Sequence, residues 1–246
     1  MRDEHRTDRS GRGAVSTLRR ERRAVLRPSA AAIAVVTGML SSGGAQAAES
    51  DAGDPAKGAR WYTVCGACHG EHGEGIRALE TPRLAGLPAS YLFRQLEAFR
   101  SGRRGTGPGD SYGQQMVPMA ALLPDARAVA DVTAYIGTLR ATPTTPAPNS
   151  AAVERGQQSY RACAACHGTS AEGIELQHAP PLAGQSSVYL IRQLRAFESR
   201  TRGGPRADAV AQTMSAAVAI LAKTGAEEDT AAYIATLPLA VNETGR

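Results

Sequence analysis

The chain has 246 residues, which is enough for one or two domains. Aromatic side chains make up only 4% of it, so two ordinary cores would be poorly filled unless a large apolar group completes each one. The formal charge is +5, but residues 1–47 hold nine Arg against four Asp or Glu, and residues 48–246 hold 19 basic and 19 acidic residues. This balance argues against a broad basic surface, and no nucleic-acid partner is expected.

Residues 1–47 are predicted to be a cleaved signal peptide. An Arg-rich start is followed by an apolar stretch from Ala30 to Leu40 and by a small-residue segment that ends in Ala45-Gln46-Ala47. This order is typical of an exported protein and predicts cleavage after Ala47. The alternative is a basic tail on a cytoplasmic protein, which would not need this order.

The apolar stretch of the leader has about eleven residues, whereas a membrane-spanning helix needs about 20, so an uncleaved anchor is disfavoured. We therefore expect a periplasmic protein without a membrane span in its mature chain. Peripheral association with a membrane is left open.

The first predicted domain, residues 48–140, is helical. Asp54 followed by Pro55 is typical of a helix start and predicts a first helix that runs into a cysteine motif. Ser90 is predicted to cap a second helix, in which Leu92, Leu96 and Phe99 recur at helical spacing.

A third helix is predicted over residues 125–139. Val129, Val132, Ile136 and Leu139 would share its buried face. The Gly- and Pro-rich segments 70–88 and 101–113 are predicted to be loops that wrap a bound group, because they contain too little apolar material to close a core.

The first helix ends in Cys65-Gly66-Ala67-Cys68-His69, and the pattern recurs in Cys163-Ala164-Ala165-Cys166-His167. Two thiols one helical turn apart can each bond a haem vinyl group, and the adjoining imidazole can ligate the iron. A disulfide or a zinc site would also use paired cysteines, but neither requires His after the second Cys in both copies. The motifs predict two covalently bound haem c groups.

The two motifs are 98 residues apart, and the same offset aligns much of the remaining sequence. It pairs Gly58 with Gly156, and it pairs Arg94-Gln95-Leu96 with Arg192-Gln193-Leu194. The Pro-rich segment 141–150 disfavours helix and is predicted to be a stiff linker. The predicted fold is therefore all-α, with two tandem small helical domains, residues 48–140 and 151–246, related by duplication.

The repeat also selects the second axial ligand of each iron. Met116 follows His69 by 47 residues, and Met214 follows His167 by the same interval. Histidine and methionine together favour the ferrous state more than two histidines do, and they occupy both axial positions. This ligand pair predicts electron transfer and not catalysis.

Three other potential ligands fail the repeat test. Met119 corresponds to Ala217 and is predicted to be a core side chain. His72 and His178 have no matching histidine in the other copy, so both are predicted to be surface residues.

The axial imidazoles also need a partner for their second ring nitrogen. Pro82 and Pro180 occupy equivalent positions and are predicted to present backbone carbonyls to His69 and His167, because proline holds its backbone steady. The alternative is an ordinary loop proline in each copy.

Residues 52–238 resemble the cytochrome c4 family of dihaem class I cytochromes. The resemblance is carried by the two haem motifs, a Pro-x-Leu-Ala-Gly segment and a Tyr-Leu-x-x-Gln-Leu helix in each half, the downstream Met, and an Ala-Tyr-Ile helix at each domain's end. It implies two haem domains related by a pseudo-twofold axis, with haem propionates near the domain interface.

The resemblance also implies individual roles. It implies one haem on Cys65, Cys68, His69 and Met116, and another on Cys163, Cys166, His167 and Met214, with the imidazoles bonded to the carbonyls of Pro82 and Pro180. Gly58 and Gly156 would lie where the first and last helices of each domain cross, close to Tyr135 and Tyr233. The segment Lys223-Thr224-Gly225-Ala226 departs from the short polar cap that usually begins the last helix.

The function predicted from these features is a periplasmic electron carrier that is not an enzyme. Its expected donor is a quinol-oxidising complex or a dehydrogenase, and its expected acceptor is a terminal oxidase. One alternative is a haem c subunit of a periplasmic dehydrogenase or oxidase complex. A dihaem peroxidase or sulfur-compound dehydrogenase is less favoured, because it needs one iron with a removable or reactive ligand.

Overall fold

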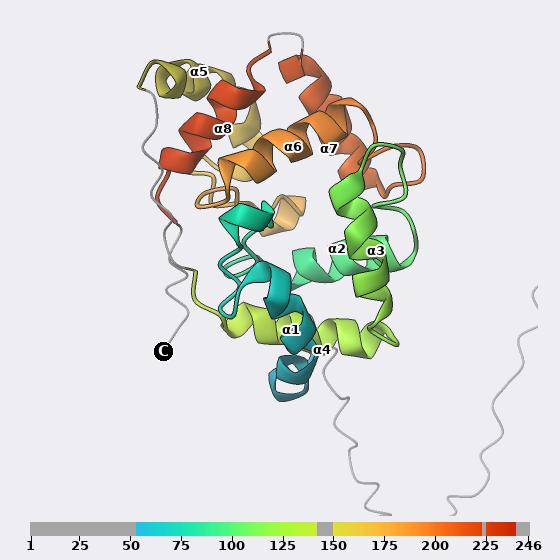
Figure 1. Ribbon diagram of the computed structural model, residues 1–246. Coiled ribbons are helices and arrows are strands. Elements are labelled where there is room, and N and C mark those ends of the chain that lie inside the picture. The colour runs from blue at the N-terminus through green and yellow to red at the C-terminus, as the bar shows by residue number, and fades with distance from the viewer. Residues whose placement is uncertain (1–52, 142–149, 223–224, 240–246) are drawn as a thin grey trace, which may run out of the picture. The chain divides into compact units, whose positions relative to one another are not determined.

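The computed structural model describes residues 53–141, 150–222 and 225–239 (Figure 1). The predicted signal peptide and linker residues 142–149 lie outside this part of the chain. The described residues belong to one compact unit, Gln46–Arg246. They form helices and no strand beyond a single bridge between Ile174 and Ala179, so the all-α prediction is confirmed.

Within the described residues, each domain contains four α-helices and one short 3-10 helix. The elements of the first domain are α1 (Pro55–His69), η1 (Arg77–Leu79), α2 (Ala89–Arg100), α3 (Ser111–Ala121) and α4 (Ala126–Thr138). Those of the second are α5 (Ser150–His167), η2 (Glu175–Gln177), α6 (Ser187–Glu198), α7 (Ala209–Ala222) and α8 (Glu227–Thr236). Ser150, which we assigned to the linker, is the first residue of α5.

The helix starts follow their capping chemistry. The carboxylate of Asp54 accepts from the backbone N–H groups of Ala56 and Lys57 at 2.9 and 3.3 Å, as predicted for α1. Asp125 caps α4 by accepting from the N–H of Ala128 at 2.8 Å. Helix α8 has no side-chain cap, and it begins after Ala226. The departure from a polar cap therefore coincides with a helix start that lies later in the second domain than the equivalent start of α4 in the first.

The prediction that Ser90 caps the second helix is wrong. The carbonyl of Pro88 already accepts from the N–H of Leu92 at 3.0 Å, so α2 begins at Ala89. Ser90 lies in the first turn, and its hydroxyl donates to the carboxylate of Glu175 at 3.3 Å.

The loop prediction for 101–113 is wrong over its last three residues. They belong to α3, because Asp110 caps that helix by accepting from the N–H of Gly113 at 2.9 Å. Helix α7 starts in the same way, since Asp208 accepts from the N–H of Ala211 at 2.8 Å. The segment 70–88 is a loop apart from η1.

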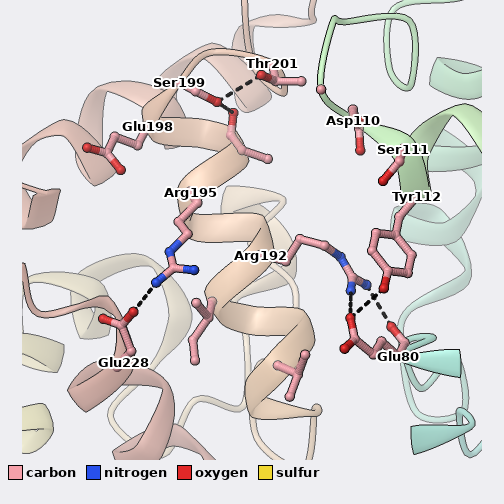
Figure 2. A pocket seen from close by; sticks show the side chains of 14 residues that line it. Glu80, Asp110, Ser111, Tyr112, Arg192, Arg195, Glu198, Ser199, Thr201 and Glu228 are labelled. Carbon is pink, nitrogen blue, oxygen red and sulfur yellow. Dashed lines mark hydrogen bonds and ion pairs between the residues drawn. The ribbon is translucent and has the colours of Figure 1, made fainter. Parts of the chain in front are cut away.

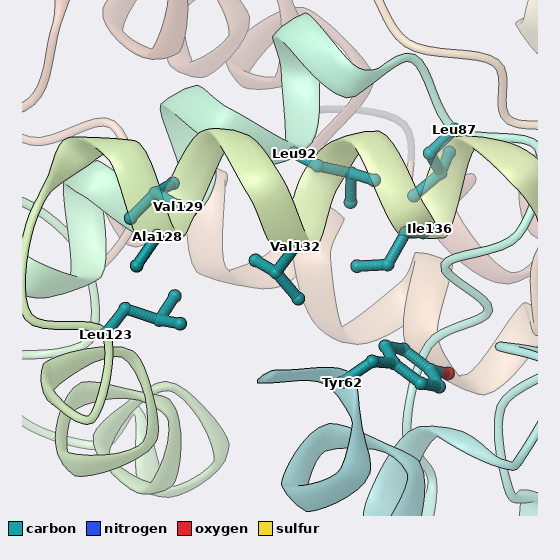
Figure 3. Close-up of a cluster of buried hydrophobic side chains, with 8 residues drawn as sticks. All are labelled: Tyr62, Leu87, Leu92, Leu123, Ala128, Val129, Val132 and Ile136. Carbon is teal, nitrogen blue, oxygen red and sulfur yellow. The ribbon is translucent and has the colours of Figure 1, made fainter. Parts of the chain in front are cut away.

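In each domain the first and last helices cross at a glycine. A Cβ built on Gly58 would lie 1.9 Å from the carbonyl oxygen of Asp131, and one on Gly156 would lie 1.9 Å from that of Asp229. The crossings that the resemblance implies are therefore present. Figure 3 shows the core of the first domain, where Val132 and Ile136 of α4 lie across from Tyr62 of α1.

Two reciprocal contacts join the domains. Arg192 of α6 donates to the backbone carbonyl of Glu80 at 2.7 Å, and Arg94 of α2 donates to that of His178 at 3.1 Å. Arg94 corresponds to Arg192 and Glu80 to His178 in the repeat, so the two contacts are related by a local twofold symmetry.

Candidate haem-binding sites

The cysteine motifs form the last turns of α1 and α5. All four cysteines are free; Cys65 and Cys163 are half-buried, and Cys68 and Cys166 are exposed. Burial raises the pKa of Cys65 to about 11 and that of Cys163 to about 11, because it disfavours the thiolate. In each motif the two thiols are three residues apart and lie on the same side of the helix.

The motif histidines are buried and oriented. His69 is 6% exposed, and its Nδ1 lies 3.0 Å from the carbonyl oxygen of Pro82. His167 is equally buried, and its Nδ1 lies 2.9 Å from the carbonyl oxygen of Pro180. The expected hydrogen bonds are therefore present.

These hydrogen bonds decide the tautomer. A carbonyl oxygen only accepts, so the proton is on Nδ1 and the lone pair is on Nε2 of each imidazole. Burial lowers the pKa of His69 and His167, an effect only partly offset by the bonds to proline carbonyls. A neutral, fixed imidazole with an available Nε2 is the form that ligates iron.

The loop after each motif is tied to its helix by backbone hydrogen bonds. In the first domain, the N–H of Gly75 donates to the carbonyl of His69 at 2.7 Å, and the N–H of Leu84 donates to Gly73 at 2.7 Å. The hydroxyl of Tyr62 donates to the carbonyl of Gly70 at 2.7 Å. The second domain repeats this arrangement with Tyr160 and Gly168, also at 2.7 Å. The proline carbonyls are held in place by this scaffold.

The residues present fit a covalently attached haem in each domain. Each motif offers two free thiols beside an imidazole whose protonated nitrogen is already bonded and whose other nitrogen carries the lone pair. Both domains have the same arrangement, down to the tyrosine that supports the loop.

The methionines predicted as second ligands lie in equivalent helices. Met116 is in α3 and Met214 is in α7, and both are partly buried. The predicted core position of Met119 is wrong, because its side chain is 37% exposed. Helix α3 buries Ala120 instead, and the preceding residue points about 100° away around the helix axis. His72 and His178 are exposed, as predicted.

A partly buried polar cluster between the domains was not predicted from the sequence. Arg104 donates to Gln95 at 2.7 Å and to Gln193 at 3.0 Å, and Arg202 donates to Gln193 at 2.5 Å and to Gln95 at 2.8 Å. The signal in the sequence is that both Arg and both Gln recur at the offset of 98 residues.

A groove of about 770 Å³ lies between the domains (Figure 2). Figure 2 shows Arg192 reaching from α6 to Glu80, with the ring of Tyr112 beside its guanidinium. None of the predicted haem-binding residues lines this groove.

No helix in the described ranges is long and apolar enough to span a bilayer.

Comparisons with known proteins agree with these features. The Cytochrome c family profile matches residues 55–140 and again residues 153–238. Cytochrome c4 of Azotobacter vinelandii is 33% identical over 180 residues, which cover 69% of this chain and 83% of that protein. The solved structure of reduced recombinant cytochrome c4 from Pseudomonas stutzeri has a TM-score of 0.62 and 27% identity, and the match covers 76% of this chain and 100% of that one.

A further relative carries a different description. The thiosulfate dehydrogenase electron acceptor of Stutzerimonas stutzeri (strain A1501) is 36% identical over 155 residues, which cover 56% of this chain. The match spans 65% of that protein, slightly less than two thirds of its length. Two matched haem domains and the cytochrome c4 relatives confirm the resemblance seen in the sequence: the chain belongs to the cytochrome c4 family of dihaem electron-transfer proteins, with two covalently bound haem c groups.

Proposed function

We propose that this protein carries electrons between members of a respiratory chain, using one His/Met-ligated haem in each domain. The proposed first site is made by Cys65, Cys68, His69 and Met116, and the second by Cys163, Cys166, His167 and Met214. When bound, each iron supplies a one-electron couple between its ferric and ferrous states. The chain's own contribution is to hold that iron on both sides and to keep its histidine oriented.

The observation that carries the proposal is the bond from Nδ1 to a proline carbonyl, present at 3.0 Å in one domain and 2.9 Å in the other. The bond that Nδ1 donates to the carbonyl of Pro82 or Pro180 holds the ring, selects its tautomer and increases the basicity of Nε2. The same hydrogen bond at His69 and at His167 supports two electron-transfer sites of the same kind. A peroxidase or a sulfur-compound dehydrogenase would need one site that differs from the other.

Absorption spectroscopy of the purified holoprotein tests the methionine ligands. The wild type should contain two haems per chain, show two one-electron couples, and have a Met-to-iron charge-transfer band in the ferric state. Met116→Ala and Met214→Ala should each remove about half of that band, since each deletes one thioether ligand. Met119→Ala is the matched control and should keep the whole band. A full charge-transfer band in Met116→Ala or Met214→Ala would mean that the substituted methionine is not the ligand.

The proposed place of action is the periplasm, after cleavage behind Ala47. The support is the order of basic, apolar and small residues in the leader. Mass spectrometry of the protein from the periplasmic fraction should find Ala48 as the first residue. A chain that keeps its leader and stays in the cytoplasm would contradict this proposal.

The proposed electron donor is a quinol-oxidising complex or a dehydrogenase, and the proposed acceptor is a terminal oxidase. A thiosulfate dehydrogenase is the second candidate donor, because a relative is described as the electron acceptor of that enzyme. Stopped-flow reduction by each purified donor distinguishes the two. Co-purification with a stoichiometric enzyme subunit would favour the alternative of a dedicated haem c subunit over a free carrier.

A further inference from the structure

The peptide unit that joins Pro82 to Arg83 connects the two domains to the first motif histidine. Its carbonyl oxygen accepts from Nδ1 of His69 at 3.0 Å. Its N–H, contributed by Arg83, donates to Oε1 of Gln185 at 2.9 Å. His69, Pro82 and Arg83 belong to the first domain, whereas Gln185 belongs to the second. One peptide group is therefore hydrogen-bonded to both domains, because its carbonyl accepts from the first domain and its N–H donates to the second.

The contact of Gln185 with this peptide is well defined. Its side chain is only 5% exposed, and its Nε2 donates to the carbonyl oxygen of Arg83 at 3.0 Å. The side-chain amide thus pairs with the N–H and the carbonyl of the same residue. The Arg83 guanidinium strengthens the contact by donating to the carbonyls of Ala183 and Gly184 at 2.7 and 3.0 Å.

The second domain has no counterpart of this connection. The residue that corresponds to Arg83 is Pro181, which has no N–H to donate. The residue that corresponds to Gln185 is Leu87, which has no acceptor. The Arg104 and Arg202 cluster obeys the twofold symmetry, but the Arg83 and Gln185 contact breaks it.

We propose that Gln185 is a positioning residue through which the second domain tunes the axial histidine of the first. An acceptor at the N–H of a peptide polarises the whole unit and makes its carbonyl a stronger acceptor, because hydrogen bonds in a chain reinforce one another. The Pro82 carbonyl then draws more strongly on the Nδ1 proton, and Nε2 of His69 becomes more basic. A more basic ligand stabilises the ferric state of the first haem and lowers its potential. This inference rests on the proposed ligation by His69.

The same contact also makes the two haems inequivalent and links redox state to domain docking. Because coupling is reciprocal, oxidation of the first site strengthens the pairing of Gln185 with the Arg83 peptide as much as that pairing favours oxidation. The Arg83 guanidinium acts in the opposite direction, since a nearby cation favours the less positive ferrous state. The test must therefore distinguish the effect of the Arg83 N–H on the potential of the first haem from the effect of the Arg83 positive charge.

The first variant is Gln185→Leu, which inserts the residue that the first domain has at the corresponding position. Redox titration followed by NMR resolves the two haems, with signals assigned through Met116→Ala and Met214→Ala. We expect the potential of the first haem to rise and that of the second to stay unchanged. In the ferrous protein, the Nδ1 proton signal of His69 should shift upfield while that of His167 remains in place.

The second pair of variants isolates the N–H. Arg83→Met and Arg83→Pro both lose the guanidinium, but only Arg83→Pro also loses the N–H, as in the second domain. The potential of the first haem should be higher in Arg83→Pro than in Arg83→Met. Adding Gln185→Leu should raise the potential in the Arg83→Met background and leave it unchanged in the Arg83→Pro background.

Equal movement of both potentials, or no movement of either, in Gln185→Leu would overturn the inference. So would an effect of Gln185→Leu that persists in the Arg83→Pro background. If Gln185→Leu does not fold, the comparison of Arg83→Pro with Arg83→Met still decides the question. Two other results would instead contradict the proposed function. One is a single redox couple in the wild type, and the other is a full methionine charge-transfer band in Met116→Ala.

Discussion

Gly58 of α1 lies directly against the backbone of Asp131 in α4, and a Cβ at this glycine would be 1.9 Å from the carbonyl oxygen of Asp131. The carboxylate of Asp131 also accepts from the N–H of Asp54 at 2.7 Å, so the start of α1 is bonded to the middle of α4. Close approach and hydrogen bonding together fix the crossing. The helix that ends in the first haem motif is held by this contact.

Gly58→Ala should destabilise the holoprotein by about 3 kcal/mol, the upper part of the usual range for overpacking, because the added methyl meets backbone and not a flexible side chain. Gly137→Ala is the matched control, since its added Cβ has no neighbour within 4 Å beyond the adjacent residues and the backbone of its own helix. It should stabilise α4 by up to about 1 kcal/mol. Chemical denaturation followed by circular dichroism measures both. Equal effects of the two substitutions would contradict the tight crossing.

Tyr62 and Tyr160 should make the protein less stable at high pH. Burial raises the pKa of both phenols above the ordinary value of about 10. Above pH ~10 the unfolded chain loses protons that the folded chain keeps, so the free energy of unfolding falls by up to about 1.4 kcal/mol per pH unit for each tyrosine.

Denaturation at a series of alkaline pH values measures this fall, and tyrosinate absorbance reports the ionisation. Tyr62→Phe lowers the stability at neutral pH, because it leaves the carbonyl of Gly70 without its phenol donor. It should also reduce the slope of stability against pH. An unchanged slope in both Tyr62→Phe and Tyr160→Phe would show that these two phenols do not cause the loss of stability at high pH.

Replacing the two symmetry-related arginines at the domain interface should lower the stability of the protein by different amounts. Arg192 bonds to both the carbonyl and the carboxylate of Glu80, at 2.7 and 3.0 Å, and its guanidinium lies 3.7 Å from the centre of the Tyr112 ring. Arg94 has only exposed contacts with His178. Arg192→Met should therefore cost about 1–2 kcal/mol, and Arg94→Met at most about 0.5 kcal/mol.

Thermal and chemical unfolding of the two arginine variants, in low and high salt, checks this difference. The loss in Arg192→Met should shrink in high salt, because salt screens the exposed part of its ion pair with Glu80. A larger loss in Arg94→Met than in Arg192→Met would reverse the ranking.

Helix capping offers a direct test of the corrected start of α2. Asp125→Ala removes the carboxylate that accepts from the N–H of Ala128 and should cost about 1 kcal/mol. Ser90→Ala removes a hydroxyl that caps nothing and contacts Glu175, so its effect should stay within about 0.5 kcal/mol. A cost as large for Ser90→Ala as for Asp125→Ala would restore the capping role that the sequence suggested.

The features predicted correctly are those with a local signature or a copy elsewhere in the chain. Asp54 caps α1 through atoms two and three residues away, and the buried face of α4 follows the helical period. The duplication supplied a second test of the haem motifs and of the prolines that bond the histidines, whereas the glycine crossings were implied by the family resemblance. The ligand roles of Met116 and Met214 remain predictions.

Two of the wrong predictions concern positions where the local sequence is compatible with more than one structure. Ser90 and Pro88 both lie at a plausible helix start, and the backbone bond of Pro88 selects the earlier one. Met119 is apolar enough for a core, but α3 turns Ala120 inward.

By itself, the sequence determined that two copies of a helical haem domain follow one another, and it predicted which cysteines and histidines would bind each haem. Only the tertiary structure decided that Gln185 meets the Arg83 peptide, since these residues are 102 positions apart and their counterparts in the repeat, Leu87 and Pro181, cannot make the same contact. A duplicated pattern reveals what the copies share. A contact that breaks the symmetry depends on how two folded surfaces meet, and no spacing along the chain encodes it.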